Sequence, residues 1–376
     1  MKINFLIFQC LLMAATPAIA EKMQFWNKQQ RGANVFNKEI SREDIKAAKN
    51  YGIAFIRLAP DKFISEARDF LIGNADNYQG LVPEDLRKLE NILDIFHEYE
   101  MPVLITVLSL PGSRWRQNNN GKDDLRIWRS ERFQNQAAKF WQDLSEAIAK
   151  HPAVIGFNVL NEPHPERLYP QGNEAEEDEV QKLLFEFYNL VIGSIRKVDE
   201  DIPIILSSSA YADPKAFRKL KRHDDEKVIY SFHMYEPYAY TNRKLNEGRF
   251  QYPGFVNGVY WDYNTLKNYM DAVVSFQRIS NVSSNRILVG EFGGHRMSKG
   301  LPNYFEELTE IFNENGWHYA FYAFREDTWD GMDYELGSKK MPWSYWQTLE
   351  RGEKPVLDRN SDTPSFKAIL DSIRKS

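Results

Sequence analysis

The sequence predicts a single α/β domain folded as a (β/α)8, or TIM, barrel with enlarged loops at the C-terminal face of the barrel. Three observations lead to this prediction. Short apolar segments alternate with helix-period segments eight times, which is typical of parallel strands joined by right-handed crossovers. The strands are apolar almost throughout, so both faces of the sheet should be covered. The long connections follow strands, which places them at one end of the barrel.

The eight expected strands are rich in Val, Ile and Phe. They are residues 31–36, 53–59, 102–110, 153–161, 203–209, 227–235, 286–292 and 317–324. A doubly wound open sheet is the alternative, but it normally carries a glycine-rich phosphate-binding turn after its first strand. The sequence contains neither GxGxxG nor GxxxxGK followed by Ser or Thr, so the closed barrel is favoured.

The segments between the strands have the spacing of amphipathic helices. One apolar face each is found in residues 86–96, 133–148 and 183–198. Ser41 followed by Asp44, and Thr363 followed by Pro364, predict helix starts. Residues 174–179, EAEEDE, should begin a solvated helix, because negative charge suits the N-terminal end of the helix dipole.

Four long connections follow strands three, four, six and eight. They are residues 111–131, 162–176, 234–262 and 325–347. The third contains eight aromatic residues. Because only one rim is elaborated, we expect a cleft at the C-terminal end of the barrel, where barrel enzymes keep their active sites.

Residues 1–20 have the features of a secretory signal peptide. Lys2 is followed by the mostly apolar residues 4–13, and Ala18-Ile19-Ala20 fits a cleavage site. The apolar run is too short to span a bilayer. We therefore expect cleavage after Ala20, a catalytic domain over residues 21–376, and a secreted or periplasmic protein without a membrane anchor.

Composition narrows the possible functions. The only cysteine, Cys10, leaves with the signal peptide, which excludes disulfides, cysteine nucleophiles and cysteine-ligated metals from the mature chain. A formal net charge of -5 argues against nucleic acid as a partner. Nine Trp and nineteen Tyr fit either a large aromatic core or a surface that stacks on flat ligands such as sugar rings. With no linker or repeat, we expect one domain and a monomer.

Two glutamates occupy equivalent positions at strand ends. Glu162 ends strand four in AVIGFNVLNEPHPE, where Pro163 prevents the strand from continuing. Glu291 ends strand seven in RILVGEFGG. In a barrel the two carboxylates converge across the mouth. Hydrolysis of a glycosidic bond needs such a pair, since one acid protonates the leaving oxygen while the other attacks, or activates water.

Further polar residues lie at neighbouring strand ends. Arg57 ends strand two and could keep one carboxylate ionised. Asn161 could hydrogen-bond a sugar hydroxyl, and His233 and Tyr235, two apart on strand six, could each bind a carboxylate. Singly, each of these residues could be structural. Their joint occurrence at the ends of strands two, four and six favours an active site.

These motifs resemble glycoside hydrolase family 5, the family of many cellulases and mannanases. The similarity runs from about Arg31 to Gly337. It is carried by FIRL around Arg57, NVLNEP at 158–163, SFHMYEP at 231–237, VGEFGG at 289–294 and YAFREDTWDGMDYELG at 322–337.

The resemblance implies a retaining mechanism, with Glu162 as the acid/base and Glu291 as the nucleophile. Arg57 and Tyr235 would steer Glu291, and Asn161 would hold the hydroxyl beside the reacting carbon.

By the same resemblance, His233 would line that subsite. Two positions depart from the family pattern. Many members carry a histidine at the end of strand three, where residues 108–110 are Leu-Ser-Leu. Many also place a tryptophan at the end of strand eight, where residues 322–324 are Tyr-Ala-Phe and Trp329 lies further on.

The expected activity is endo-hydrolysis of β-1,4-glucan as a polysaccharide or oligosaccharide, with β-mannan as an alternative. Stacking platforms are expected at Trp115, Trp128, Tyr238, Tyr240, Trp261 and Trp329. The alternative from another functional class is a carbohydrate-binding barrel without catalytic activity. A metal-dependent hydrolase usually needs paired histidines at an early strand end, and strands one to three have none. We therefore expect no metal and no cofactor.

Overall fold

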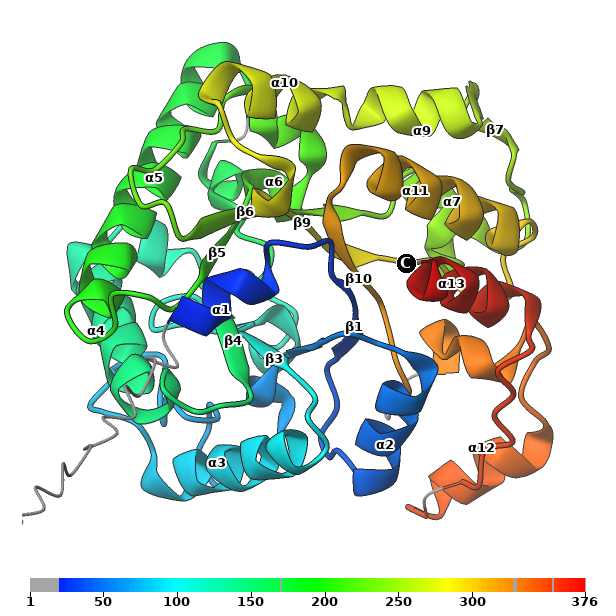
Figure 1. The fold of residues 1–376 in the computed structure, drawn as a ribbon, viewed down its shortest axis with the longest axis horizontal. Coiled ribbons are helices and arrows are strands. Elements are labelled where there is room, and N and C mark those ends of the chain that lie inside the picture. Colours follow the sequence, from blue (N-terminus) through cyan, green and yellow to red (C-terminus); the bar gives the residue numbers. More distant parts are fainter. Residues whose placement is uncertain (1–19, 170, 327–329, 354, 376) are drawn as a thin grey trace, which may run out of the picture.

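Eight parallel strands form a closed barrel around one axis (Figure 1). The structure is a computed structural model that describes residues 20–375, apart from 170, 327–329 and 354, so residues 1–19 of the expected signal peptide lie outside it. The barrel strands follow the chain order, and the last one pairs with the first. They are β1 (Arg31–Val35), β2 (Ile56–Leu58), β3 (Val103–Thr106), β4 (Val154–Asn158), β5 (Ile204–Ser207), β6 (Val228–Met234), β9 (Ile287–Phe292) and β10 (His318–Phe321).

The eight predicted strands and the TIM-barrel fold are confirmed. The observed strands are shorter than predicted because their apolar ends continue into buried loop segments. The sequence reasoning missed a hairpin in the long loop after β6, where β7 (Gly254–Val256) pairs with β8 (Val259–Trp261) in antiparallel fashion.

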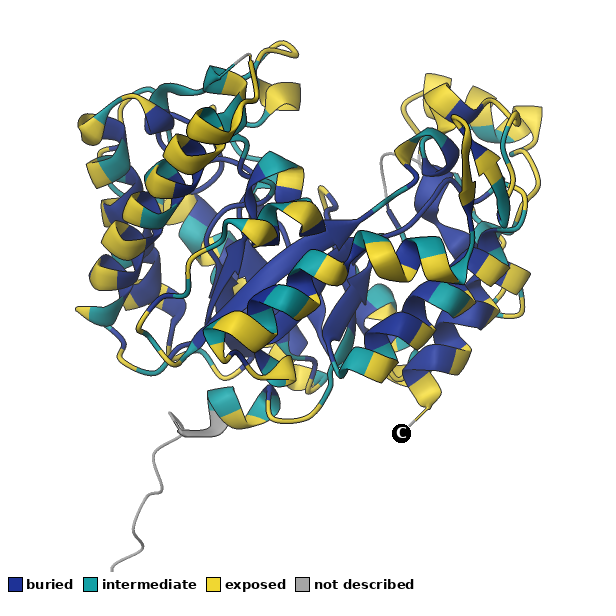
Figure 2. Ribbon diagram, turned by 90° about the horizontal axis from the view of Figure 1, so that it is seen from above, coloured by how far each residue is buried: buried dark blue, intermediate teal, exposed yellow. Residues whose placement is uncertain are grey.

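Helices cover the outside of the barrel, with buried inner faces and exposed outer faces (Figure 2). The longer ones are α2 (Arg42–Tyr51), α3 (Pro83–Glu98), α4 (Glu131–Ile148), α5 (Glu174–Arg196), α10 (Asp271–Ser280), α11 (Leu301–Asn315) and α13 (Pro364–Arg374). The predicted helix starts are confirmed. The Ser41 side chain accepts the Asp44 amide at the start of α2, and Pro364 opens α13. No helix among the described residues is long and apolar enough to cross a membrane.

The connections contain shorter helices. They are α1 (Ala20–Phe25), α6 (Ser209–Ala212), α7 (Tyr238–Thr241), α8 (Arg243–Asn246), α9 (Tyr263–Tyr269) and α12 (Trp343–Glu350). The short 3-10 helices are η1 (Pro60–Lys62), η2 (Arg116–Asn118), η3 (Arg126–Trp128), η4 (Pro165–Leu168), η5 (Pro214–Arg218), η6 (Ser284–Arg286), η7 (Asp330–Met332) and η8 (Tyr334–Leu336).

An apolar plug closes the N-terminal end of the barrel. The plug consists of Trp26, Phe55, Leu104, Ile155, Ile205, Ile229, Leu288 and Ala320. Trp26 directly follows α1, which crosses this end of the barrel in Figure 1. Its ring is fully buried, and its Nε1 donates to the backbone oxygen of Ile155 at 3.1 Å. Trp26 thereby helps to fix the N-terminal segment to the barrel, together with Phe25, which packs edge to face on Phe55.

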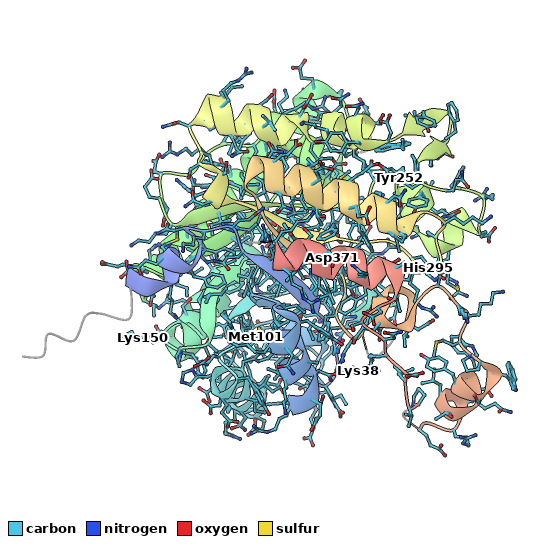
Figure 3. All side chains as sticks on the ribbon, turned by 45° about the vertical axis from the view of Figure 1, so that its right-hand side comes forward. Lys38, Met101, Lys150, Tyr252, His295 and Asp371 are labelled. Atoms are coloured by element: carbon cyan, nitrogen blue, oxygen red, sulfur yellow. The ribbon has the colours of Figure 1, made fainter. Side chains whose placement is uncertain are left out.

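The long loop after β6 packs back onto α11. Tyr252, labelled in Figure 3, meets Tyr304 of α11 edge to face with ring centroids 5.2 Å apart. The Tyr252 amide donates to the backbone oxygen of Lys299 at 3.0 Å. This packing fixes the loop whose first residues line the cleft described below.

Candidate active site

Strand pairing brings polar residues to one level of the barrel. The pairs are Asn34 with Arg57, Thr106 with Asn158, and His233 with Glu291. All six side chains belong to residues that are at least nine-tenths buried. Buried polar groups need partners, so these residues form one connected network rather than isolated contacts.

At this level the carboxylate of Glu291 meets that of Glu162. One side-chain oxygen of Glu162, one of Glu291 and a ring nitrogen of His233 all lie within 4.8 Å of one another. Glu291 belongs to β9, whereas Glu162 lies four residues beyond the end of β4 with a φ of 50°. A positive φ is uncommon for a residue with a side chain, and here it accompanies the turn into Pro163 at a functional position.

The Glu291 carboxylate is held at both oxygens. Arg57 Nη1 donates to Oε1 at 2.8 Å, and Tyr235 Oη donates to Oε2 at 2.8 Å. The Arg57 guanidinium is fully buried, and only 6% of the Glu291 side chain is exposed. The two contacts fix the direction of both oxygens, which a nucleophile requires.

Arg57 is the centre of the polar network. Besides Glu291, its nitrogens donate to Asn34 at 2.8 Å, Asn158 at 2.8 Å, Asn161 at 2.7 Å and Thr106 at 3.2 Å. Sequence reasoning missed Asn34, Thr106 and Asn158. The sequence signal that could have identified them is a polar residue within an otherwise apolar strand. Burying such a residue is costly, so its presence indicates a buried partner, here the Arg57 guanidinium.

Asn161 is oriented by the same guanidinium. Its Oδ1 accepts from Arg57, and since Arg57 has only donors, the amide nitrogen of Asn161 must be on the other side. Asn161 lines the cavity that contains both carboxylates. Its NH2 group is therefore a donor suited to a hydroxyl oxygen.

Glu162 has different surroundings. Burial raises the pKa of its carboxyl to about 7, although Arg57 and His164 lower it in part. His233 Nδ1 lies 2.9 Å from Glu162 Oε1, and burial lowers the pKa of His233 to about 4. His233 is therefore neutral near pH 7. A neutral imidazole can donate to a carboxylate or accept from a carboxylic acid, so it can serve Glu162 in both protonation states.

A glycine makes room for this histidine. A Cβ on Gly290 would lie 2.6 Å from Ser231 Oγ and 3.1 Å from His233 Nε2. Both contacts are closer than ordinary side-chain packing allows. The glycine before Glu291 is therefore required by the approach of β6.

Glu162, His233 and Glu291 also offer three atoms that could ligate a metal ion. Arg57, however, already places a buried positive charge 2.8 Å from Glu291, which opposes the entry of a second cation. The expectation of metal-independent chemistry stays a prediction.

Two adjoining cavities open at the carboxylates and share Glu162. The first, of about 450 Å³, is lined by Glu291 and Asn161 and is called the Glu291 cavity; it also includes Phe36, Lys62, Leu108, Trp115 and Tyr322. The second, of about 400 Å³, is lined by Tyr211 and Tyr238 and is called the Tyr211 cavity. Both volumes are in the range of small-molecule sites.

The aromatic predictions divide into three groups. Trp115 lines the Glu291 cavity, and Tyr238, which is 49% exposed, lines the Tyr211 cavity. Trp128 and Trp261 do not serve as platforms in this structure, because they are only 3% and 8% exposed. Trp329 lies outside the described residues.

The two buried tryptophans, and Tyr240, have packing roles instead. Trp128 packs edge to face against Phe187 of α5, and Trp261 packs against Tyr269 of α9. Tyr240 is fully buried. An aromatic residue in a predicted loop looks the same in the sequence whether it packs inward or outward.

The departures from the family pattern also have a structural outcome. Leu108 lines the Glu291 cavity after β3, and the polar groups nearby include Lys62 and Gln117, which are joined by a hydrogen bond of 3.0 Å. Tyr322 lines the cavity after β10 and meets Phe36 edge to face at 5.3 Å. The aromatic wall at this end is therefore tyrosine and phenylalanine.

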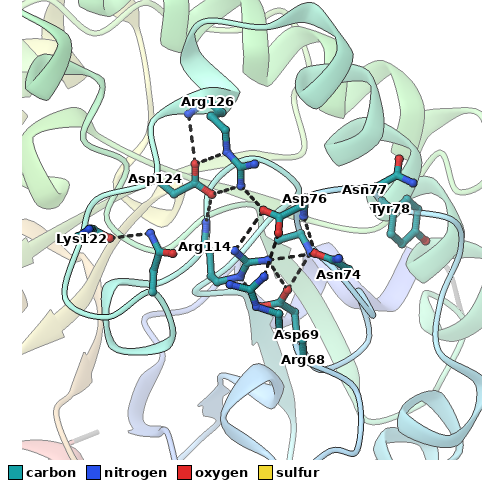
Figure 4. A network of polar contacts seen from close by, with 12 residues as sticks. Arg68, Asp69, Asn74, Asp76, Asn77, Tyr78, Arg114, Lys122, Asp124 and Arg126 are labelled. Carbon is teal, nitrogen blue, oxygen red and sulfur yellow. Dashed lines mark hydrogen bonds and ion pairs between the residues drawn. The ribbon is translucent and has the colours of Figure 1, made fainter.

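A buried ion network fastens the loops after β2 and β3 to each other (Figure 4). Arg114 makes a bidentate pair with Asp69, at 2.8 and 2.9 Å, and a further contact with Asp76 at 3.2 Å. Arg126 reaches Asp76 at 2.6 Å. Since Trp115 directly follows Arg114, this network sets where that ring enters the cleft.

A (β/α)8 barrel with paired glutamates at the C-terminal ends of its strands has the arrangement used for glycoside hydrolysis. The family model for cellulase, glycosyl hydrolase family 5, matches residues 19–328. The chain belongs to this family, as the sequence motifs indicated.

Two curated relatives illustrate the distance within the family. Endoglucanase C of Acetivibrio thermocellus is 23% identical over 238 residues, which are 60% of this chain and 62% of the relative. Cellodextrinase A of Ruminococcus flavefaciens is 21% identical over 285 residues, covering 74% of this chain and 76% of the relative. The chain thus spans under two thirds of the length of endoglucanase C.

Solved structures confirm the fold. Cel5A of Thermotoga maritima, solved with mannotriose, has a TM-score of 0.64 at 15% identity and covers 94% of this chain and 99% of its own. The cellulose synthase subunit Z of Clostridioides difficile has a TM-score of 0.61 at 18% identity, with coverage of 93% and 100%.

Proposed function

We propose that the protein hydrolyses β-1,4-linked glucan internally, with retention of configuration, by double displacement between two glutamates. The observation that carries this proposal is the distance of at most 4.8 Å between an oxygen of Glu162 and an oxygen of Glu291. Retaining glycosidases hold their carboxyls about 5–5.5 Å apart, whereas inverting ones leave about 6.5–9.5 Å for a water molecule. The observed gap fits the retaining class.

In the first step, a Glu291 oxygen attacks the anomeric carbon while Glu162, protonated, gives its proton to the glycosidic oxygen. The bond between the anomeric carbon and that oxygen breaks, and the leaving sugar departs with a hydroxyl group. In the second step, Glu162 takes a proton from water, whose oxygen attacks the same carbon and releases Glu291. Two inversions give net retention.

The surroundings of the glutamates suit these roles. Arg57 and Tyr235 each hold one oxygen of Glu291 and so aim its carboxylate, as attack on the anomeric carbon requires. The raised pKa of Glu162 keeps it protonated up to about neutral pH. Asn161 can donate to a hydroxyl of the reacting sugar, a contact that strengthens in the transition state.

The proposed substrate is supported by the relatives, and the proposed location by the N-terminal residues. The curated relatives named above are an endoglucanase and a cellodextrinase, which supports β-1,4-glucan as the substrate. The signal-like residues 1–20 support secretion, where such polymers are met. β-Mannan remains the alternative, since mannotriose is the ligand named for one structural neighbour.

The test of the substrate uses carboxymethyl cellulose, lichenan, mannan and xyloglucan, with product sizing. We expect the fastest release of reducing sugar, and products of intermediate length, on β-glucan. Faster release from mannan would select the alternative, and the absence of reducing sugar from all four would leave a carbohydrate-binding barrel.

The test of the acid/base uses Glu162→Ala with an activated aryl β-cellobioside and added azide. A good leaving group needs no acid, so we expect substantial first-step activity and a β-cellobiosyl azide product. Wild-type protein with azide is the control and should give cellobiose. An α-configured azide would contradict double displacement.

A further inference from the structure

The two cavities have different places in the reaction, if the proposed function holds. Glu291 lines only the Glu291 cavity, so the sugar that it attacks must lie there. Glu162 lines both cavities, and it protonates the oxygen that leaves. The leaving part of the substrate therefore extends from Glu162 into the Tyr211 cavity.

The Tyr211 cavity contains an unusual stretch of backbone. Ala210, Tyr211 and Ala212 have φ values of 55°, 60° and 62°. Three successive residues with side chains in the left-handed region are unfavourable, because each Cβ approaches a neighbouring carbonyl oxygen. Such conformations persist where surrounding contacts impose them, and they cluster at functional sites.

The surrounding contacts come from the segment that carries the acid. The Ala210 amide donates to Glu166 Oε2 at 3.0 Å, and the Tyr211 amide donates to the Pro163 backbone oxygen at 3.3 Å. On the other side, Gln181 donates to Ser209 Oγ at 2.8 Å. The turn is thereby tied both to the loop after β4 and to α5.

The outcome of this turn is a fixed tyrosine ring. The ring of Tyr211 stacks on that of His164, with centroids 4.8 Å apart and planes 6° from parallel. His164 is itself held by a contact of 2.9 Å between its Nδ1 and the backbone oxygen of Glu162. With 39% of its surface exposed, Tyr211 keeps a free area at the cavity. The acid and this ring are thus two parts of one local structure.

We propose that Tyr211 is the stacking platform for the first sugar of the leaving group, and that the enzyme accordingly prefers oligomeric and polymeric leaving groups over small ones. The His164 ring covers one face of Tyr211, and the exposed part of Tyr211 lines the cavity, so its other face can stack on the apolar face of a pyranose. Tyr238, in the loop after β6, lines the same cavity and would contact the sugar from the other side.

The test compares a sugar leaving group with one that has no ring. Tyr211→Ala should lower kcat/KM on cellopentaose about tenfold, the size expected for one stacked ring. On β-cellobiosyl fluoride, kcat/KM should change by less than about twofold. Fluoride leaves without help from an acid and without occupying the Tyr211 cavity, so this substrate uses only the contacts in the Glu291 cavity. Tyr211→Phe keeps the ring and should behave as wild type on both substrates.

A second readout separates a platform from a merely structural tyrosine. With β-cellobiosyl fluoride as donor and cellobiose as acceptor, the ratio of transfer to hydrolysis should fall about tenfold in Tyr211→Ala, since the acceptor occupies the same cavity. Tyr260→Ala, which removes an exposed tyrosine of β8 that lines neither cavity, is the matched control and should leave both readouts unchanged.

An unchanged kcat/KM on cellopentaose, or an equal loss on both substrates, would overturn the platform while leaving the proposed hydrolase in place. A wild-type protein that cleaves neither β-cellobiosyl fluoride nor β-glucan would overturn the proposed function, and the platform with it.

Discussion

The two ends of the barrel are built from the same strands and differ in what fills them. At the N-terminal end the inward side chains are apolar, and two residues further along the same strands they are polar. The change runs from Phe55 to Arg57, from Leu104 to Thr106, from Ile205 to Ser207, and from Ile229 to Ser231 and His233. Since successive inward residues of a strand are two apart, one step separates a packed core from an active site.

The comparison shows how the stability and the chemistry of this fold are divided. The apolar plug needs only packing, which burial of large side chains supplies. The polar level buries a guanidinium and a carboxylate, which are costly to remove from water and are kept only because each has several partners. The following variants alter one end at a time.

The largest expected effect is on activity. Glu291→Gln removes the proposed nucleophile and should lower kcat on β-glucan by about 10⁴-fold or more, as loss of a covalent catalyst does. Because Gln keeps an oxygen near Arg57 but leaves its buried charge unpaired, the free energy of unfolding should fall as well, so kcat is measured per folded molecule. Turnover close to the wild-type rate would remove Glu291 from the mechanism.

Arg57→Met should damage both properties. Removing one partner of a buried ion pair costs about 3–5 kcal/mol of unfolding free energy, because Glu291 and three amide oxygens lose their donor. Activity should fall by about 10²-fold or more as Glu291 loses orientation. Urea unfolding and initial rates measure the two effects. A variant as stable as wild type would show that the polar level is not held together by Arg57.

Trp26→Ala should affect stability alone. Truncating a fully buried tryptophan costs about 3–5 kcal/mol. The plug is separated from the carboxylates by the polar level, so kcat per folded molecule should stay within about twofold of wild type. Thermal unfolding and active-site titration provide the two measurements. A large loss of kcat in the folded fraction would show that the two ends are coupled.

The smallest effect concerns pH. In the proposed mechanism Glu162 is protonated in the first step, so kcat/KM should fall as the pH rises through about 7, the pKa to which burial raises this carboxyl. The folded protein holds this proton more tightly than the unfolded chain, so stability is also lost as the pH rises through that value. Between about pH 5 and 7, where the folded protein binds this proton and the unfolded chain does not, the melting temperature of Glu162→Gln should therefore fall less than that of wild type. Equal losses would place the titration elsewhere.

How far the sequence predicts this molecule differs between the scaffold and the cleft. Apolar runs and helical spacing predicted the barrel, because burial leaves a periodic pattern. The proximity of Glu162 and Glu291 was predictable because the ends of parallel strands share one rim, and the structure places their oxygens within 4.8 Å of each other. The hydrogen-bond acceptors around Arg57 were missed, since a polar residue within a strand gives no sign of its partner on another strand.

Loop aromatics were the least predictable feature. Trp128 and Trp261 face the core. Tyr211 reaches the cleft through a left-handed turn whose three residues include no glycine, so the sequence does not show the turn. That turn is imposed by Glu166 and the Pro163 carbonyl oxygen, both about 45 residues earlier in the chain. Local sequence does not encode such long-range constraints.

The central claim is that Glu291 forms a covalent bond to the sugar. Incubation with 2,4-dinitrophenyl 2-deoxy-2-fluoro-β-cellobioside, followed by peptide mass spectrometry, tests it directly, because the fluorine slows release of the glycosyl-enzyme. We predict one fluorocellobiosyl group per molecule, on the peptide that contains Glu291. Labelling of another residue, or hydrolysis to an inverted product without any adduct, would contradict the account.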